Sequence, residues 1–514
     1  MTLRKIVLPL LLACALLTGC EQAAPAEDEE LTPIPILEEL PELPSRNILP
    51  QVFSLPYAPD QTLDPITCPD GMQQTVSSLL YEGLFRLNEQ FEPQPWLCER
   101  YTYTPPERET STACTYTLVL RSGVTFSDGT PLTAADVKAT LNRAKTSERY
   151  GSRFSFVQSI SAEETTLTIT LSRPNTGFTA LLDIPIVKSG TEDDPVPLGT
   201  GPYLFSTTDT TAYLVANQSW WRDDSRPVDL ITLTEAADRD TMLYRFTSHD
   251  VQLVTADLTG TAPISATGNI SYQDADTTVL QYIGCNTTRE PLNNVVLRRA
   301  LSLGFNRSHL VSAFLSGHAM AAQFPVSPVT NLYPAELEER YSLERFTESL
   351  AACGYTPEQP LSLLVNSENS FKVSIAQYLA ETYTAAGVPV EVRILPWEEY
   401  TAALAAGDFD LYYGEVKLTA DWDLTALLGT NSPLNYCGRV DPVADQLLTA
   451  FSAAEDRAAA MENLCRHLRS QAALFPICFK STSVLMQSGV LENLTSTATE
   501  PFYGLSDCII NLHH

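Results

Sequence analysis

The sequence predicts an α/β protein built from more than one packed lobe. Three observations lead to this prediction. Between Leu361 and Tyr413, strand-like and helix-like segments alternate along the chain. The length of 514 residues is enough for two or three hydrophobic cores. The composition, with 44% apolar and 18% charged residues, is typical of globular proteins.

The first 20 residues have the pattern of a secretion signal. Arg4 and Lys5 precede an apolar run of about a dozen residues, which is the usual order in such signals. The run is shorter than the roughly 20 residues of a membrane-spanning helix. It ends in Leu17-Thr18-Gly19-Cys20, which resembles a bacterial lipobox. We expect residues 1–19 to be removed and Cys20 to be lipidated, so that the mature chain is extracytoplasmic and membrane-anchored.

Residues 20–50 have the composition of a tether. An acidic block at 27–30 precedes five prolines between Pro33 and Pro50. High charge, few apolar side chains and frequent proline keep such a segment extended and unpacked. We expect a spacer that separates the folded body from the membrane; binding of a partner is the alternative.

Charge and motif content exclude several classes of function. A net charge of −30 predicts a surface that repels nucleic acid and anionic lipid headgroups. Nine of the 11 cysteines follow Cys20, and none belongs to a Cys-x-x-Cys pair, which argues against a zinc cluster and leaves one or two disulfides open. No Gly-x-Ser-x-Gly, His-Glu-x-x-His or phosphate-loop motif is present. We therefore expect no catalysis, no metal site and no cofactor.

The first part of the body contains clear element signals. Residues 115–120 and 167–171 have the composition and alternation of strands. Thr133 and Asp136 form a capping-box pattern before a helix that extends toward Ala144. The segment before it, Phe126-Ser-Asp-Gly-Thr-Pro131, has the residues of a tight turn.

The strongest βαβ signal lies in the second half of the chain. The expected order is strand 361–365, helix 371–386 ending at Gly387, strand 388–394, helix 397–406 ending at Gly407, and strand 409–413. This order predicts a largely parallel sheet with helices on its faces. Ligands of open parallel sheets bind beyond the carboxyl ends of strands, where we expect residues 414–423 to lie.

Four separated segments identify a family resemblance. They are Thr62-Leu63-Asp64-Pro65 with Leu80–Phe85, Leu120–Val137, Gly199–Tyr203, and Cys285-Asn286-Thr287 with Val296–Leu301. In order and spacing they resemble the extracytoplasmic solute-binding proteins of the oligopeptide/dipeptide/nickel family, which deliver substrates to ABC importers. The resemblance covers roughly residues 50 to 510.

The resemblance implies a bilobal, periplasmic-binding-protein-like clamp with an extra inserted domain. It divides the body into lobe I (51–75, 196–281 and 482–514), an inserted domain (76–195) and lobe II (282–481). The crossovers near 281 and 481 would form a hinge, around which the lobes close on a ligand.

The resemblance also implies a ligand site in lobe II. In peptide-binding members, an Asp after a strand accepts the terminal ammonium of the peptide, and Ala420-Asp421-Trp422 matches the second half of that motif. A carboxylate beside an aromatic wall binds ammonium through a charge-assisted hydrogen bond, and Trp422 could add a cation–π contact. The family Trp earlier in the motif is replaced by Glu415. The alternative is a turn in which Asp421 and Asp423 are solvated or cap a helix beginning at Leu424.

Peptide-binding members also add the ligand as an extended strand. Here it would pair with the backbone of Gly414, Glu415 and Val416 and with the first-lobe edge at 53–57. Further candidates for the wall of the site are Tyr412, Trp397 and Asn366, with Lys372 and Lys417 considered for a ligand carboxylate.

The resulting functional hypothesis is a lipid-anchored, monomeric receptor that captures short peptides and presents them to an ABC permease. The alternatives keep the fold and change the ligand to a nickel or iron chelate, a sugar or a modified amino acid. A role in sensing without import, or a chaperone role, fits the same sequence. A surface peptidase is a weaker alternative, because it needs a nucleophile or metal set that the motifs do not supply.

Overall fold

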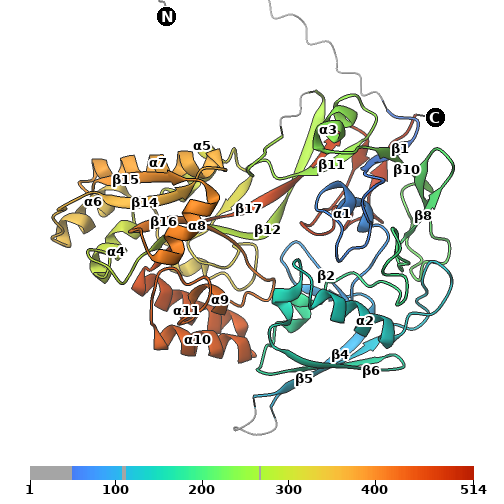
Figure 1. Ribbon diagram of the computed structural model, residues 1–514, viewed down its shortest axis with the longest axis horizontal. Helices are drawn as coiled ribbons and strands as arrows, with labels where there is room; N and C mark the ends of the chain where they lie inside the picture. The colour runs from blue at the N-terminus through green and yellow to red at the C-terminus, as the bar shows by residue number, and fades with distance from the viewer. Residues whose placement is uncertain (1–48, 107–111, 265–267, 514) are drawn as a thin grey trace, which may run out of the picture. The chain divides into compact units, whose positions relative to one another are not determined.

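The computed structural model describes residues 49–106, 112–264 and 268–513. The predicted signal, Cys20 and the tether up to residue 48 lie outside the described residues. Two four-stranded sheets and one seven-stranded sheet organise the described chain, and helices cover the seven-stranded sheet (Figure 1). The fold is therefore mixed α/β, as the sequence predicts.

The first four-stranded sheet joins segments that are far apart in the sequence. Its order is β1 (Phe53–Tyr57), β10 (Leu230–Glu235), β9 (Ala212–Ala216) and β8 (Tyr203–Thr207). β1 runs parallel to β10, and the other pairs are antiparallel. Phe53, Tyr203 and Leu214 share one hydrophobic core with Phe502 near the C-terminus. Three stretches of the chain thus contribute to this core.

The second four-stranded sheet is antiparallel and local in sequence. Its order is β4 (Cys98–Thr104), β5 (Cys114–Leu120), β7 (Thr166–Leu171) and β6 (Val157–Glu163), and α2 (Ala134–Ala144) packs against it. The two predicted strands and the predicted helix are confirmed. The capping box is present, because the Thr133 side chain accepts from the Asp136 amide and Asp136 accepts from the Thr133 amide.

The seven-stranded sheet contains the predicted βαβ units. Its path is β11 (Leu253–Ala256), β17 (Leu474–Gln487), β12 (Ile270–Cys285), β16 (Leu411–Lys417), β14 (Leu361–Asn366) and β15 (Val390–Leu395), with β13 (Ala319–Ala321) paired to β17. β14 is parallel to both β15 and β16, and the crossovers are α7 (Ser370–Ala385) and α8 (Trp397–Ala406). One difference from the prediction matters for the site: β16 continues to Lys417, so Gly414–Val416 lie within the strand and not beyond its end.

β12 and β17 form a long antiparallel pair that links the two sides of the molecule (Figure 1). Their pairing runs from Ile270 opposite Gln487 to Gly284 opposite Leu474. The register shifts between Asp276 and Leu280, so this pair contains a β-bulge. The bulge is adjacent to the positions near 281 and 481 where crossovers are expected.

The remaining elements complete the lobes. The other helices are α1 (Met72–Ser77), α3 (Arg239–Thr247), α4 (Val295–Ser302), α5 (Arg307–Phe314), α6 (Leu343–Ala352), α9 (Thr425–Leu428), α10 (Pro442–Ala453) and α11 (Arg457–Gln471). Short strand pairs are β2 (Phe85–Leu87) with β3 (Pro93–Pro95), and β18 (Leu491–Glu492) with β19 (Ile509–Ile510). No helix of the described ranges is both long and apolar enough to cross a bilayer.

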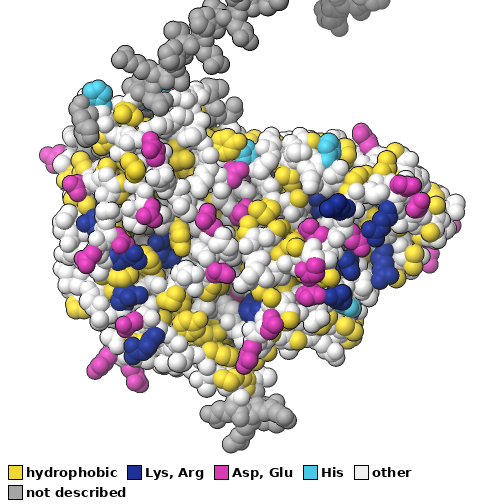
Figure 2. All heavy atoms as spheres, turned by 180° about the vertical axis from the view of Figure 1, so that it is seen from behind, with side chains coloured by type: hydrophobic (Ala, Val, Ile, Leu, Met, Phe, Trp, Pro, Cys, Tyr) yellow, Lys and Arg dark blue, Asp and Glu magenta, His cyan; other side chains and the backbone are white. Residues whose placement is uncertain are grey.

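The cysteines of the described chain are unpaired, and its surface carries many acidic side chains. The nine cysteines between Cys68 and Cys508 all carry free thiols, and eight of them are buried. Burial raises the pKa of Cys98 to about 11, which makes that thiol a poor nucleophile at neutral pH. Acidic side chains are spread across the face shown in Figure 2, in keeping with the net charge of −30.

Candidate ligand-binding site

β16 has one paired edge and one edge that is open over half its length. On one side it pairs with β12 from Leu411 to Lys417. On the other side it pairs with β14 only at Leu411 and Tyr412, and no other strand of the described residues continues that edge. The open segment is therefore Tyr413–Lys417, which contains the predicted Gly414–Val416.

The hydrogen-bond alternation shows which residues face the open edge. The Asn286 amide donates to the Asp410 carbonyl (2.8 Å) and the Leu418 amide to the Thr278 carbonyl (3.0 Å), so even-numbered residues of β16 bond to β12. Odd-numbered residues point their backbone groups the other way, and Tyr400 donates to the Tyr413 carbonyl there. Glu415 and Lys417 are both exposed and direct their N–H and C=O groups to the open edge.

Asn366 and Trp397 lie close together at the carboxyl ends of the parallel strands β14 and β15, where both contact Glu368. Asn366 ends β14, and its side-chain amide donates to Glu368 Oε2 (2.8 Å). The Trp397 backbone amide at the start of α8 donates to Glu368 Oε1 (2.7 Å). Trp397 is 56% exposed and stacks on Tyr400, whereas Asn366 is buried. Of the two, only Trp397 presents a free surface.

Four charged residues meet beside the open edge, two from strands, one from a helix and one from the loop after β11; we call Lys372, Glu415, Lys480 and Asp257 the hinge cluster. Glu415 Oε2 lies 3.3 Å from Lys372 Nζ and 4.0 Å from Lys480 Nζ, and it accepts from Gln281 (2.8 Å). Lys480 also pairs with Asp257. Burial lowers the pKa of the Lys372 ammonium, and the Glu415 carboxylate opposes that effect. The two lysines are nearly buried, and each already contacts a carboxylate.

Asp421 is a buried carboxylate without an ion pair to any described residue. It is 3% exposed; Oδ2 accepts from the Asn175 side chain (2.8 Å) and Oδ1 from the Thr419 hydroxyl (2.6 Å). Asp423 is different, because it pairs with Arg173 (2.5 Å) and accepts from the Thr425 amide at the start of α9. The capping alternative thus describes Asp423, whereas the Asp421 carboxylate forms no ion pair with a described residue and Arg457 donates only to the Asp421 backbone carbonyl.

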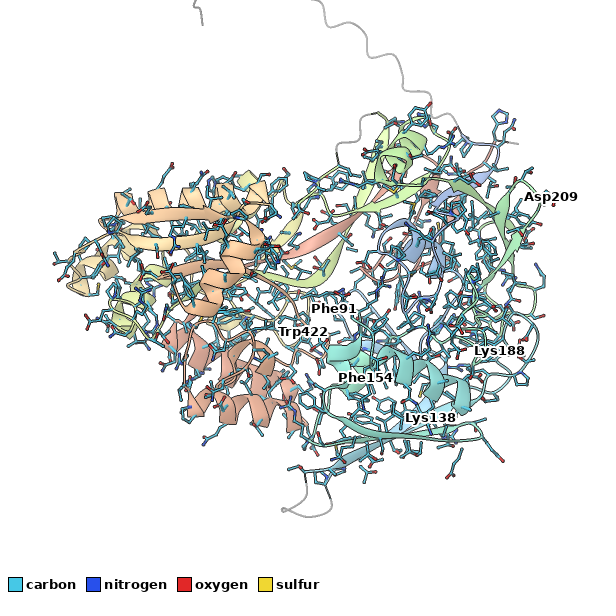
Figure 3. All side chains as sticks on the ribbon, in the orientation of Figure 1. Phe91, Lys138, Phe154, Lys188, Asp209 and Trp422 are labelled. Carbon is cyan, nitrogen blue, oxygen red and sulfur yellow. The ribbon has the colours of Figure 1, made fainter. Side chains whose placement is uncertain are left out.

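Trp422 and Tyr412 lie in the hydrophobic core. Trp422 is 2% exposed and makes edge-on contacts with Phe91 (5.5 Å between ring centroids) and Phe479 (5.7 Å). Figure 3 shows Phe91 and Trp422 side by side where the two halves of the molecule meet. Tyr412 donates to the Tyr282 hydroxyl (3.3 Å) inside the same core. The Trp422 ring thus presents almost no accessible surface.

The remaining residues predicted to contact the ligand are Gly414, the β1 edge and Lys417. A Cβ on Gly414 would lie 2.4 Å from Cζ of Tyr282, so that only glycine fits at this position. The five residues of β1 are buried, and its edge is engaged at Ser54, whose amide donates to Gln252 Oε1 (2.7 Å). Lys417 is exposed and forms no ion pair with a described residue.

Sequence reasoning missed three residues of this region: Asn175, Lys480 and Asp257. Lys480 follows the apolar run Phe475–Phe479, so a charge next to a buried strand was the available signal. Asn175 and Asp257 carried no such signal. In the described residues, no group of three His, Cys, Asp or Glu side chains is placed to hold a metal ion.

Comparison with known proteins identifies the family. A model of bacterial extracellular solute-binding proteins, family 5 (middle region), matches residues 92–433. Glutathione-binding protein GsiB of Escherichia coli K12 is 27% identical over 395 residues, which cover 72% of this chain and 76% of GsiB. The unliganded open form of the periplasmic murein tripeptide-binding protein MppA superposes with a TM-score of 0.73 at 19% identity, covering 90% of this chain and 97% of MppA. A nickel ABC transporter protein of Bacillus halodurans gives 0.72 at 22% identity, covering 88% and 98%.

The family model spans well over half of the chain, and both solved structures share its bilobal fold. This chain belongs to the family 5 bacterial extracellular solute-binding proteins, the solute-binding components of ABC importers.

Proposed function

We propose that this chain captures short peptides and passes them unaltered to an ABC permease. The observation that carries this proposal is the open edge of β16, where Glu415 and Lys417 offer backbone donors and acceptors to an extended ligand. Main-chain pairing gives affinity for any peptide and leaves side-chain preference to the surrounding pockets. Similarity to proteins named for binding glutathione and a murein tripeptide supports the same ligand class.

Asp421 is the proposed acceptor of the peptide ammonium. A buried carboxylate that is hydrogen-bonded but not ion-paired can gain a charge-assisted bond from a cationic ligand. The Asn175 amide now occupies Oδ2, so the ammonium would replace a neutral donor with a charged one. Trp397 supplies exposed apolar surface near the carboxyl ends of β14 and β16.

The proposed lobes close around this ligand. Lobe I would comprise 51–75, 196–281 and 482–514, and lobe II 282–481, with 76–195 as the inserted domain. The hydrophobic core formed by residues between 283 and 478 lies wholly within the proposed lobe II and supports its boundaries, while the seven-stranded sheet connects the two lobes. Lys480 lies opposite the irregular stretch of β12 between Asp276 and Leu280, and its contacts with Asp257 and Glu415 support a hinge at this point.

We also propose that Cys20 is lipidated and tethers the protein to the membrane. The support is the sequence Leu17-Thr18-Gly19-Cys20 after a basic, apolar leader. Metabolic labelling with an alkyne fatty acid tests this: the wild type should be labelled and membrane-bound, and Cys20→Ala should be unlabelled. Labelling of the variant at the wild-type level would contradict the proposal.

Calorimetry with defined ligands tests the peptide proposal. Glutathione and trialanine should bind with one site per chain, and each should be recovered unchanged after incubation. The nickel–histidine complex and maltose represent the alternative ligand classes, and neither should bind comparably. Tight binding of the nickel complex with no peptide binding would overturn the proposal, as would hydrolysis of the peptide by the purified chain.

A further inference from the structure

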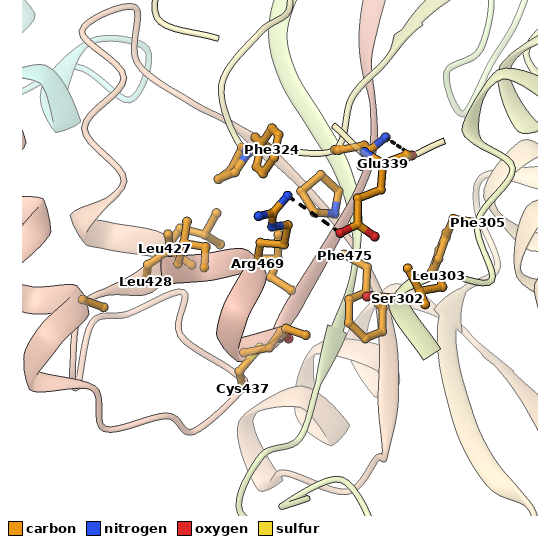
Figure 4. A pocket seen from close by; sticks show the side chains of 18 of the residues that line it. Ser302, Leu303, Phe305, Phe324, Glu339, Leu427, Leu428, Cys437, Arg469 and Phe475 are labelled. Carbon is orange, nitrogen blue, oxygen red and sulfur yellow. Dashed lines mark hydrogen bonds and ion pairs between the residues drawn. The ribbon is translucent and has the colours of Figure 1, made fainter. Parts of the chain in front are cut away.

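A pocket within the predicted lobe II shares no lining residue with the candidate peptide site. It lies between the loop that joins α4 to α5, the start of β17, and α9 and α11 (Figure 4). Its cavity volume is about 90 Å³, several times the roughly 10–15 Å³ needed for one water. This is room for a small organic molecule.

The wall of the pocket is largely apolar. Aromatic rings and leucines from separate elements form it: Leu303, Phe305, Phe324, Leu427, Leu428 and Phe475. Figure 4 shows Phe305 and Phe475 on one side and Leu427 and Leu428 on the other. A ligand with an apolar body would therefore be covered on opposite sides.

The charged groups of the pocket are predominantly cationic. Four arginines and two acids line it: Arg307, Arg340, Arg439, Arg469, Glu339 and Asp441. Both acids are already paired. Asp441 contacts Arg439 and His467 (2.7 Å), and Glu339 contacts Arg345 (2.9 Å) and Arg469 (3.8 Å). This excess of positive charge contrasts with the net charge of −30 of the whole chain.

Arg307 is, with Arg340, one of the two pocket arginines that form no ion pair in the described chain, and the Glu338 carboxylate acts on it only from a distance. Its Nε donates to the Pro476 carbonyl (2.7 Å) and its guanidinium lies 5.2 Å from the centroid of the Phe305 ring. It forms no ion pair with any described residue, and no hydrogen bond of its two Nη atoms to the described chain is present. Burial lowers the pKa of the Arg307 guanidinium to about 10, which still leaves it charged at neutral pH. Nε thus fixes the guanidinium, while two nitrogens stay free for an anion.

We propose that this pocket binds a small monocarboxylate with an aromatic or branched apolar body. The carboxylate pairs with the two free Nη atoms of Arg307, for which the planar guanidinium is suited. The apolar body lies between Phe324, Phe475 and the α9 leucines. The site is independent of the peptide site, because none of its lining residues belongs to β16, the hinge cluster or the Asp421 loop.

Calorimetry with phenylacetate, its neutral amide and 2-phenylethylamine tests the proposal on the unmodified chain. Phenylacetate should bind at one site, the amide at least about tenfold more weakly because it lacks the charge-assisted bonds, and the amine not at all. Binding should persist in the presence of saturating trialanine or glutathione. Equal affinity for acid and amide would overturn the proposal, and so would competition with the peptide or no binding of phenylacetate at millimolar concentration.

Variants locate the site. Arg307→Met should reduce phenylacetate affinity to that of the amide, while Arg307→Lys should keep part of the preference for the acid. The matched control is Arg466→Met, because Arg466 is exposed on α11, pairs only with Glu462 and does not line the pocket. Leu428→Trp fills the opposite wall and should block acid and amide alike. Equal loss in the Arg466 and Arg307 variants, or full binding to Leu428→Trp, would contradict the assignment.

Discussion

Replacement of Glu415 by proline tests the role of the open β16 edge. Proline has no N–H, and on an edge strand it is tolerated where that N–H points away from the sheet. The Glu415 amide points to the open edge, so its removal leaves the bonds to β12 intact. In the neighbouring position, Val416→Pro would remove an N–H that bonds to β12 opposite Leu280.

The known net energy of a hydrogen bond gives the size of the expected effect. One backbone hydrogen bond contributes about 0.5–1.5 kcal/mol net, which corresponds to about 2- to 13-fold in Kd. If closure of the lobes buries the ligand carbonyl without a partner, the loss rises to about 1–3 kcal/mol, or about 5- to 160-fold. Glu415→Pro also removes the carboxylate from Lys372 and Lys480, so the relevant reference is Glu415→Ala.

The assay is calorimetric titration of trialanine or glutathione into the wild type, Glu415→Ala and Glu415→Pro, with thermal unfolding of all three. Glu415→Pro should bind at least twofold more weakly than Glu415→Ala and unfold at a similar temperature. Val416→Pro should lower the unfolding temperature clearly, because it leaves a β12 acceptor unpaired. Identical affinities of the proline and alanine variants, with the fold intact, would refute pairing of the ligand with the Glu415 amide.

Three further predictions concern charge and packing. Asp421→Asn should weaken the binding of peptides with a free amino terminus by about tenfold relative to acetylated peptides, since charged hydrogen bonds are about twice as strong as neutral ones. The control variant Asp423→Asn should weaken both peptide forms equally, and calorimetry with both forms decides this. Gly414→Ala should destabilise the fold by about 1–3 kcal/mol, measured in urea, because its Cβ would meet the Tyr282 ring; unchanged stability would contradict that packing. Burial raises the pKa of Glu82 above its usual 4.5, although the hydrogen bonds that its carboxylate accepts oppose this shift. The native state therefore keeps the Glu82 proton to a higher pH than the unfolded chain does. Stability therefore falls as pH rises through this window, and Glu82→Gln should show a smaller fall; equal pH slopes would contradict the shift.

The βαβ part of lobe II could be predicted because its signals are local. Apolar spacing marked α7 and α8, and Gly387 and Gly407 both adopt the positive φ that ends a helix. The end of β16 was placed too early, at Tyr413. Glycine and the charged residues Glu415 and Lys417 are not typical of a strand, and their place in β16 depends on pairing with β12.

The site was harder to predict because its partners are distant in sequence. Asn175 is 246 residues from Asp421, and nothing near either residue indicates that contact. Trp422 illustrates the same limit: an aromatic ring after an acidic residue suits a ligand wall and a core equally well. Its contacts with Phe91 and Phe479, from two other parts of the chain, place it in the core.

Amide hydrogen exchange of the β16 edge is the most direct test of the central claim, which is that an extended solute pairs with this strand. Addition of saturating trialanine or glutathione should slow exchange at Glu415 and Lys417, whose amides face the open edge, and should leave Gly414 and Val416 nearly unchanged because β12 already protects them. A ligand that binds and raises the unfolding temperature without slowing exchange at Glu415 or Lys417 would contradict the account.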